Sequence, residues 1–297
     1  MNTRRLGLMG LAGVTLGGSV VISRVGLGEM PAFTLIALRL TLAAGAFAII
    51  LAVLRPPLPV GRRMWTDIAL VGVLNTALPL TAFILALQYM SSGVTALFLA
   101  LIPLSTGLMA HVGLAQEKLT LQKLSGLALA FCGVAVLLLT GTSGLPTILN
   151  VRGPVLALTA VLLSSFATVY ARRQLGQANV ISLTAFQTFV AALVLVPLGL
   201  LLARTDLTAV SPTGWLAVAY TGLVGSVLAF LAFFQLIREF GATSAAETTY
   251  LAPPVSGLLG VLLLDELISG TLVFGAILIL LGVYVAERVP KPRRGTA

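Results

Sequence analysis

The chain has 297 residues, of which 58% are hydrophobic and 9% charged, and its mean hydropathy is +1.08. A soluble domain carries roughly 25% charged residues, so this composition excludes a water-soluble globular protein and indicates one embedded in a membrane. The net charge of +9 would suggest nucleic acid as a partner in a soluble protein. Here, however, the basic residues lie in short breaks between apolar runs, which is typical of membrane loops.

Ten apolar runs follow one another along the chain, each close to the roughly 20 residues that a helix needs to cross a bilayer. Their approximate bounds are 6–27, 32–54, 65–90, 93–114, 121–140, 153–170, 181–203, 214–237, 243–264 and 270–286. The first run follows two arginines, as a cleaved signal peptide would. It is long, however, and lacks an Ala-x-Ala ending, so we interpret it as a retained helix. The breaks between the runs are short, and we expect no domain outside the membrane.

The second half of the chain repeats the first. Landmark residues recur at separations of 148 to 150 positions, among them the pairs Gly93/Gly241, Pro103/Pro253, Glu117/Glu266, Gly133/Gly282, Trp65/Trp215, Gly72/Gly222 and Arg24/Arg172. Arg39 is matched by Gln187, so this basic residue is not duplicated. A long internal match indicates that the fold is built from two copies of one unit. We therefore predict two five-helix repeats, 1–144 and 145–297.

The basic residues are distributed unequally between the two sides of the membrane. If the N-terminus is cytoplasmic, fourteen of the eighteen lie in inner segments and three, Arg24, Arg152 and Arg204, in outer loops. This bias predicts that both termini are cytoplasmic. Because each repeat has an odd number of helices, the second repeat then enters the membrane upside down relative to the first. Inverted repeats of this kind recur in transporters that work by alternating access, and a duplicated scaffold or passive pore is the alternative.

Each half contains a helix with a central proline, a glutamate at its end and a glycine-spaced helix after it. In the first half these landmarks are Pro103, Glu117, Gly126 and Gly133, and in the second Pro253, Glu266, Gly275 and Gly282. Together with Arg39 in the second helix, this pattern resembles the ten-helix EamA branch of the drug/metabolite transporter superfamily, over nearly the whole chain. The resemblance implies an all-α inverted-repeat fold and export of small metabolites across the bacterial inner membrane. It also implies a central cavity lined by the first, third and fourth helices of each half. Within the branch, the chain is similar to exporters of aromatic amino acids, methionine and threonine.

Prolines near the middle of three of the predicted spans point to the same region. A proline removes a backbone donor and displaces the carbonyl four residues back, which must then face protein, water or a ligand. The prolines are Pro79, Pro103, Pro253 and Pro254, and the carbonyls belong to Asn75, Leu99, Thr249 and Tyr250. A kink needed only for packing is the alternative. We expect these prolines and Arg39 to be structural or hinge positions, with Arg39 holding helices together through carbonyls or carboxylates.

Polar and aromatic residues inside the spans are the candidates for substrate contact. The predicted set is Asn75, Phe83, Tyr89, Phe98, Leu99, Gln235, Glu247 and Tyr250. Glu247 is the only carboxylate that we place well inside a span. It would receive a substrate ammonium or carry a coupled proton, or else lie near the cytoplasmic interface as a solvated charge. Glu117 and Glu266 fall at breaks between helices, where each can cap the N-terminus of the next helix.

These features favour an inner-membrane exporter of aromatic or hydrophobic amino acids that works by alternating access. A proton-coupled efflux pump for multiple drugs or cations is one alternative, although the first helix lacks the acidic residue that small pumps of that kind use. A membrane enzyme or scaffold that transports nothing is the other. We identify no catalytic cluster, metal site or cofactor motif in the sequence. The expected partners are a small-molecule substrate and the lipid bilayer, without nucleic acid, and we expect a monomer.

Overall fold

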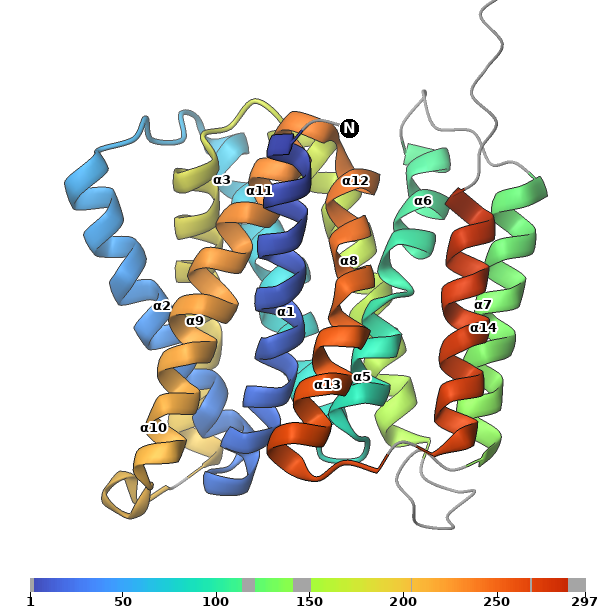
Figure 1. Ribbon diagram of the computed structural model, residues 1–297. Coiled ribbons are helices and arrows are strands. Elements are labelled where there is room, and N and C mark those ends of the chain that lie inside the picture. Colours follow the sequence, from blue (N-terminus) through green and yellow to red (C-terminus); the bar gives the residue numbers. More distant parts are fainter. Residues whose placement is uncertain (1–2, 114–120, 141–150, 204, 268, 288–297) are drawn as a thin grey trace, which may run out of the picture.

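The computed structural model describes residues 3–113, 121–140, 151–203, 205–267 and 269–287. Every regular element among them is helical (Figure 1). Six helices are continuous: α1 (Thr3–Glu29), α2 (Ala32–Leu54), α7 (Leu121–Thr140), α8 (Arg152–Leu175), α9 (Val180–Leu202) and α14 (Gly270–Glu287). A short 3-10 turn, Leu207–Ala209, lies between α9 and α10. The all-helical fold class predicted from the sequence is confirmed.

The other four predicted spans are helices with an interruption. Two of them contain a π-helical stretch, and two contain a break or a 3-10 turn. The segments are α3 (Arg62–Val71), η1 (Gly72–Ala77) and α4 (Leu78–Ala86); α5 (Ser92–Leu99) and α6 (Ile102–Gly113); α10 (Pro212–Ala219), η3 (Tyr220–Leu228) and α11 (Ala229–Phe240); and α12 (Ala242–Ala246), η4 (Glu247–Leu251) and α13 (Ala252–Leu264). The π-helical stretches and the two breaks fall at matching places in the two halves, and π-helices often mark functional sites.

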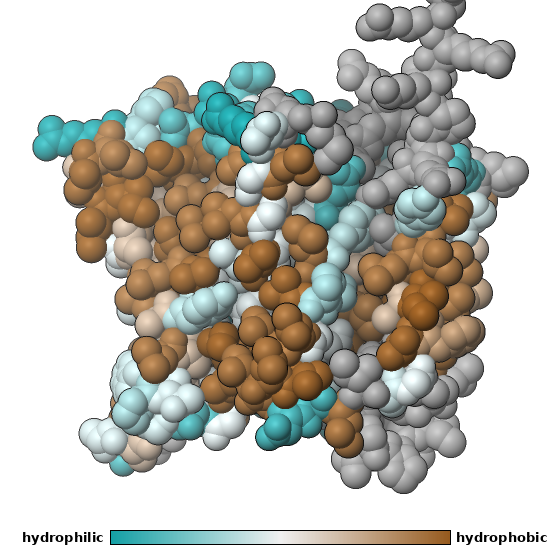
Figure 2. Space-filling view, viewed as in Figure 1, coloured by the Kyte–Doolittle hydropathy of each residue, from teal (hydrophilic) through white to brown (hydrophobic). Residues whose placement is uncertain are grey.

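Eight of these spans are long and apolar enough to cross a membrane. The remaining two, α7 and α14, are 20 and 18 residues long and pack against each other. Large apolar side chains such as Leu193, Leu201 and Leu216 are exposed on the outside, and Figure 2 shows a broad hydrophobic surface between two more polar ends. Such a surface would be unfavourable in water but suits contact with lipid.

Equivalent contacts hold the two halves together. A side chain on Gly72 would meet the backbone oxygen of Gln187 at 2.8 Å, and one on Gly222 would meet the backbone oxygen of Arg39 at 3.1 Å. Helix α9 therefore packs on η1 in the same way as α2 packs on η3, and each contact needs a glycine. Small residues at such crossings let helix backbones approach closely, as is usual in membrane proteins.

Two arginines at matching positions bind the ends of helices on opposite faces of the molecule. Arg24 donates to the carbonyl of Leu87, directly after α4. Arg172 donates to the carbonyls of Ile237 and Arg238 at 2.8 and 2.9 Å, near the end of α11. A cation placed there satisfies carbonyls that have no partner within the helix and interacts favourably with the helix dipole. We call the face that holds the start of α1 and the end of α11 the N-terminal face. The other, which holds the ends of α1 and α4, is the opposite face (Figure 1).

Glu266 corrects one expectation. Its carboxylate caps a helix N-terminus, but that of α5 in the other half of the chain rather than that of the next helix, α14. It accepts from the amide and the hydroxyl of Ser92 at 2.7 and 2.8 Å, and from the amide of Gly93 at 3.3 Å. The chain turns back directly after α13, where Asp265 has a left-handed φ of 50°. That turn directs Glu266 toward α5, which packs against α13. Glu117 lies outside the described residues.

Candidate functional site

A cavity of about 130 Å³ lies in the interior of the helical assembly. Both halves of the chain line it: α1, α2, η1, α4, α5 and α6 from the first half, and α8, η3, α11 and η4 from the second. The lining residues are Leu16, Ser19, Val20, Ser23, Arg39, Asn75, Pro79, Leu80, Phe83, Ile84, Leu87, Thr95, Leu99, Ile102, Ser164, Thr168, Gly225, Phe230, Phe233 and Thr249. The interrupted spans contribute to this wall, so the cavity lies where the helices depart from regular geometry.

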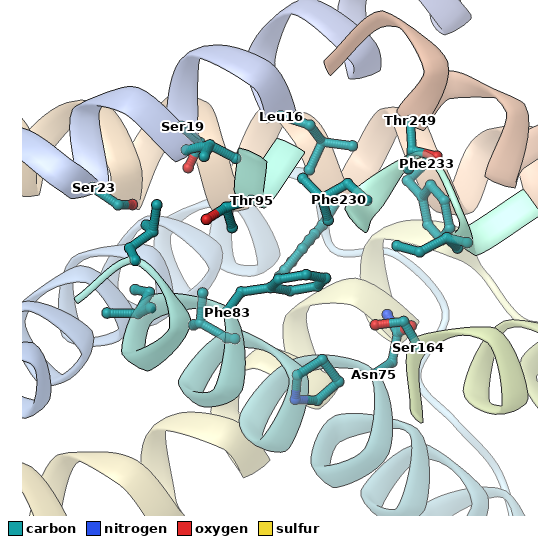
Figure 3. Close-up of a pocket in the computed structure, with 18 of the residues that line it drawn as sticks. Leu16, Ser19, Ser23, Asn75, Phe83, Thr95, Ser164, Phe230, Phe233 and Thr249 are labelled. Carbon is teal, nitrogen blue, oxygen red and sulfur yellow. The ribbon is translucent and has the colours of Figure 1, made fainter. Parts of the chain in front are cut away.

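Aromatic and aliphatic side chains form most of the wall. In Figure 3, Phe83 and Phe230 lie in the middle of the cavity, between two groups of polar side chains. Phe233 adds a third ring and packs edge to face against Phe234, with 5.7 Å between the ring centroids. Aromatic rings provide large apolar contact areas with preferred stacking geometries, so this part of the wall suits a planar or apolar portion of a solute.

One polar group of the wall surrounds Arg39. The guanidinium lies at the contact between α2 and η3, and Arg39 is 5% exposed. Its Nε donates to the hydroxyl of Ser226 at 2.8 Å, Nη2 to the carbonyl of Gly225 at 3.0 Å, and Nη1 to the hydroxyl of Ser23 at 3.4 Å. Ser19 also belongs to this group. Its hydroxyl lies so close to Gly225 that a Cβ atom added to this glycine would be 2.3 Å from it.

A second polar group lies across the rings from the first. Asn75 from η1 and Ser164 from α8 face the cavity there (Figure 3). Thr168 follows Ser164 by one helical turn and donates to its carbonyl at 2.7 Å, and Thr249 donates to the carbonyl of Ala246 at 2.8 Å. These side chains are neutral and offer both donors and acceptors. The cavity therefore combines a cationic end, an aromatic middle and a neutral polar end.

The helix breaks predicted from the prolines lie beside the cavity. Helix α5 ends at Leu99 and α6 begins at Ile102, just before Pro103. The hydroxyl of Ser165 donates to the carbonyl of Ile102 at 3.2 Å, so a side chain from α8 supports the backbone at the break. In the second half, η4 forms a tight 3-10 turn directly before Pro253 and Pro254.

The structure brings only some of the predicted site residues together. Those that line the cavity are Arg39, Asn75, Pro79, Phe83 and Leu99. Three aromatic candidates, Tyr89, Phe98 and Tyr250, do not line the cavity; they pack in a hydrophobic cluster around α5, to which Phe83 and Leu99 also belong. Pro103 and Pro253 are buried at the helix breaks, whereas Pro254 is exposed.

Glu247 and Gln235 lie near the N-terminal face, away from the cavity wall. The Glu247 carboxylate forms an ion pair with Arg5 at 2.6 Å, and its side chain is 20% exposed. Gln235 donates to Glu239, which pairs with Arg4 at 2.7 Å. Of the three possibilities considered for Glu247, this position favours a charge near the interface over a contact with the substrate or a proton carrier in the cavity.

Sequence reasoning missed some features of the structure. Asp67, near the start of the span that begins at α3, is buried outside the cavity wall and accepts from the hydroxyl of Tyr170 at 2.7 Å. Several wall residues, including Thr168 and Phe230, were not among the candidates. The spacing of Ser164 and Thr168, four residues apart on one helix face, was a signal that could have identified Thr168.

Comparisons with known proteins agree with this architecture. The model described as "EamA-like transporter family" matches residues 5–139 and again 151–287. The "Uncharacterized inner membrane transporter YedA" of Escherichia coli (strain K12) is 30% identical over 289 residues, which cover 92% of this chain and 90% of that protein. The "Uncharacterized transporter YoaV" of Bacillus subtilis (strain 168) is 22% identical, over 94% of this chain and 95% of that one. A solved structure titled "Crystal structure of protein" shares the fold, with a TM-score of 0.70 and 24% identity over 94% of this chain and 95% of that chain.

The family match covers both halves of the chain and nearly all of its described helices. The protein is thus a multi-pass membrane transporter rather than an enzyme, with a small-molecule substrate and membrane lipid as its partners. On these grounds the chain belongs to the EamA-like transporter family.

Proposed function

We propose that the protein exports small amphipathic metabolites, above all aromatic and hydrophobic amino acids, across the inner membrane by alternating access. The observation that carries this proposal is the cavity shared by both halves, with phenylalanine rings between two polar groups. An aromatic or branched side chain would contact the rings, while the amino acid backbone would face hydroxyl, amide and guanidinium groups.

In this proposal the chain consists of two repeats, 1–144 and 145–297, inserted in opposite orientations. The matching contacts of Gly72 and Gly222 support the duplication. The hydrogen bonds from Arg24 to Leu87 and from Arg172 to Ile237 lie on opposite faces and support the inversion. Most described arginines outside the spans gather at the N-terminal face, so we assign this face and both termini to the cytoplasm. They are Arg4, Arg5, Arg55, Arg62, Arg63, Arg172, Arg173 and Arg238, against Arg24 and Arg152 at the opposite face.

Polar contacts between the halves lie at both faces and suggest how access alternates. At the N-terminal face, Arg5 pairs with Glu247. At the opposite face, Glu266 binds the start of α5. In alternating access, contacts at one face open while those at the other stay closed, and two inverted repeats can exchange these roles. Each contact is worth only a few kcal/mol at most, which is compatible with a reversible cycle.

The composition of the wall disfavours the efflux pump for cations. A cationic substrate, or a proton exchanged for it, calls for an acidic group in the binding site. Among the described residues that line the cavity there is no aspartate or glutamate, and the one ionisable group there is the guanidinium of Arg39. The wall therefore attracts negative rather than positive charge.

Uptake into proteoliposomes tests the proposal. Purified protein is reconstituted, and accumulation of labelled phenylalanine, leucine and methionine is compared with that of the cation tetraphenylphosphonium, with and without a pH gradient. We expect saturable movement of the amino acids and none of the cation above empty vesicles. Movement of tetraphenylphosphonium alone would favour the efflux pump, and movement of no solute would contradict the proposed function.

A further inference from the structure

Among the residues that the structure describes, Arg39 is a buried positive charge without a negative partner. It lies in the first half of α2, inside a span, and is 5% exposed. It donates to two hydroxyls and one backbone carbonyl, all neutral. In the described part of the chain, the ion pairs join Arg4 to Glu239 and Arg5 to Glu247, and none reaches Arg39. A charge in this environment is costly unless an opposite charge or water compensates it.

Packing of the helices does not require this charge. At the matching contact in the other half, α9 packs on η1 with Gln187 in the place of Arg39. Gln187 is completely buried, as Arg39 nearly is, yet it is neutral and does not line the cavity. Since the same helix crossing forms with a neutral residue, the charge of Arg39 calls for another explanation.

The guanidinium of Arg39 lies at one end of the cavity, beside other hydrogen-bonding groups. Arg39, Ser19, Ser23 and Gly225 all line it, and the first three supply hydrogen-bond donors at one end. A guanidinium has five N–H groups, of which three are used in the contacts to Ser226, Ser23 and Gly225. The remaining two can donate to a ligand. The weak contact to Ser23, at 3.4 Å, can also be exchanged for a stronger one with an anion.

We propose that Arg39 binds the carboxylate of the transported solute and so restricts the substrates to amphipathic carboxylates. The geometry behind this inference is a buried guanidinium at one end of an aromatic cavity without acidic wall residues. The inference rests on the proposed function, which it narrows to a substrate class. The apolar body of the solute then lies against Phe83 and Phe230. A substrate amino group, where present, faces the neutral oxygens of Asn75 and Ser164.

The test compares carboxylates with neutral compounds of the same shape. The probes are 3-phenylpropionate against 3-phenylpropionamide, and phenylalanine against phenylalaninol, each measured by counterflow in proteoliposomes. An arginine–carboxylate pair in a desolvated site predicts that wild-type protein prefers each carboxylate by at least about tenfold. Arg39→Gln, which installs the residue of the other repeat, should reduce this preference to about threefold or less. Arg39→Lys keeps the charge but loses the paired geometry, and should retain part of the preference.

Gln187→Met is the matched control, because it changes the equivalent buried position outside the cavity wall and should keep the wild-type preference. Equal movement of acid and amide by wild-type protein overturns the inference while leaving the transporter intact, and this result does not depend on any variant folding. An unchanged preference in folded Arg39→Gln overturns it as well. Movement of no probe and no amino acid contradicts the proposed function, and the inference with it.

Discussion

Removing the Glu266 carboxylate should open the face of the protein opposite to the N-terminus. Glu266 accepts three hydrogen bonds from Ser92 and Gly93 at the start of α5, at 2.7, 2.8 and 3.3 Å. This is an attachment between the two halves of the chain. In the alternating-access account it exists only while this face is closed, so its loss shifts the balance between closed and open states.

The size of the shift follows from these contacts. A hydrogen bond to an ionised group contributes about 1.5 to 3 kcal/mol, and a carboxylate at a helix N-terminus adds about 0.3 to 1 kcal/mol. Because Glu266 is partly exposed, we take about 2 kcal/mol for the three contacts together. Glu266→Ala should therefore change the ratio of open to closed protein about 30-fold. Glu266→Gln keeps an acceptor but loses the charge, and about fivefold is expected.

Accessibility of a cysteine in the cavity measures this ratio. The native Cys132 is exposed and is first replaced by alanine. Ser23→Cys, a nearly isosteric change in the wall, is then labelled from the outer side with a membrane-impermeant thiol reagent. Asp206→Asn is the control, since its carboxylate is contacted by the amide and hydroxyl of Thr208 in its own turn rather than by the other half. Equal labelling rates in Glu266→Ala and in the control, both folded, would refute the reasoning.

Three further predictions concern the ion pair at the N-terminal face, the helix packing and the membrane topology. Arg5→Ala removes a partly exposed ion pair with Glu247, so labelling of the Ser23→Cys thiol from the cytoplasmic side should rise by at most about fivefold. Adding Glu247→Gln to Arg5→Ala should change this rate little, and a large additive effect would show that the two residues act separately. Gly133→Ala places a side chain 2.7 Å from the backbone of α14 and should destabilise the protein by about 1 to 3 kcal/mol, as measured by thermal unfolding. Gly45→Ala, with open space around it, is the control and should be neutral or slightly stabilising. Equal effects of the two changes would contradict the packing argument. Reporter fusions after Asp206 and at the C-terminus should report opposite sides of the membrane, and the same side for both would contradict the inverted repeat.

The positions of the helix breaks could be predicted because their cause is local. Proline has no amide hydrogen, so the turn before it loses a backbone hydrogen bond and is easily distorted, although α9 continues through Pro197. The break between Leu99 and Ile102 and the 3-10 turn before Pro253 follow from this rule. The repeat was also visible in the sequence, because glycines and charged residues recur at a fixed separation. These features placed Asn75, Phe83 and Leu99 near the cavity without any knowledge of tertiary contacts.

The choice of wall residues could not be predicted with the same success. Neighbouring residues on a helix differ in direction by about 100°, so a side chain next to a wall residue points elsewhere. Leu99 and Phe98 both belong to the cluster around α5, but Leu99 lines the cavity whereas Phe98 is completely buried and does not. The rotation of each helix depends on its neighbours, which no local pattern records.

Long-range partners were equally hidden from the sequence. Nothing near Glu266 indicates that it binds Ser92, which is 174 positions away. The same holds for Glu247 and Arg5, separated by 242 positions. Arg39 was expected to hold helices together, and its contacts with Ser226 and Gly225 do join α2 to η3. Its place in the cavity wall depends on its position relative to the second half of the chain, which the sequence does not show.

Access to Leu99 from both sides of the membrane shows whether the cavity opens alternately to each side. Leu99 lines the cavity at the helix break, so a cysteine placed there, in protein lacking Cys132, reports on the cavity alone. Alternating access predicts that Leu99→Cys is labelled by an impermeant thiol reagent from either side, and that saturating phenylalanine slows both reactions. Labelling that is confined to one side under all conditions, or that is unaffected by phenylalanine and by every carboxylate that the protein moves, would contradict the account.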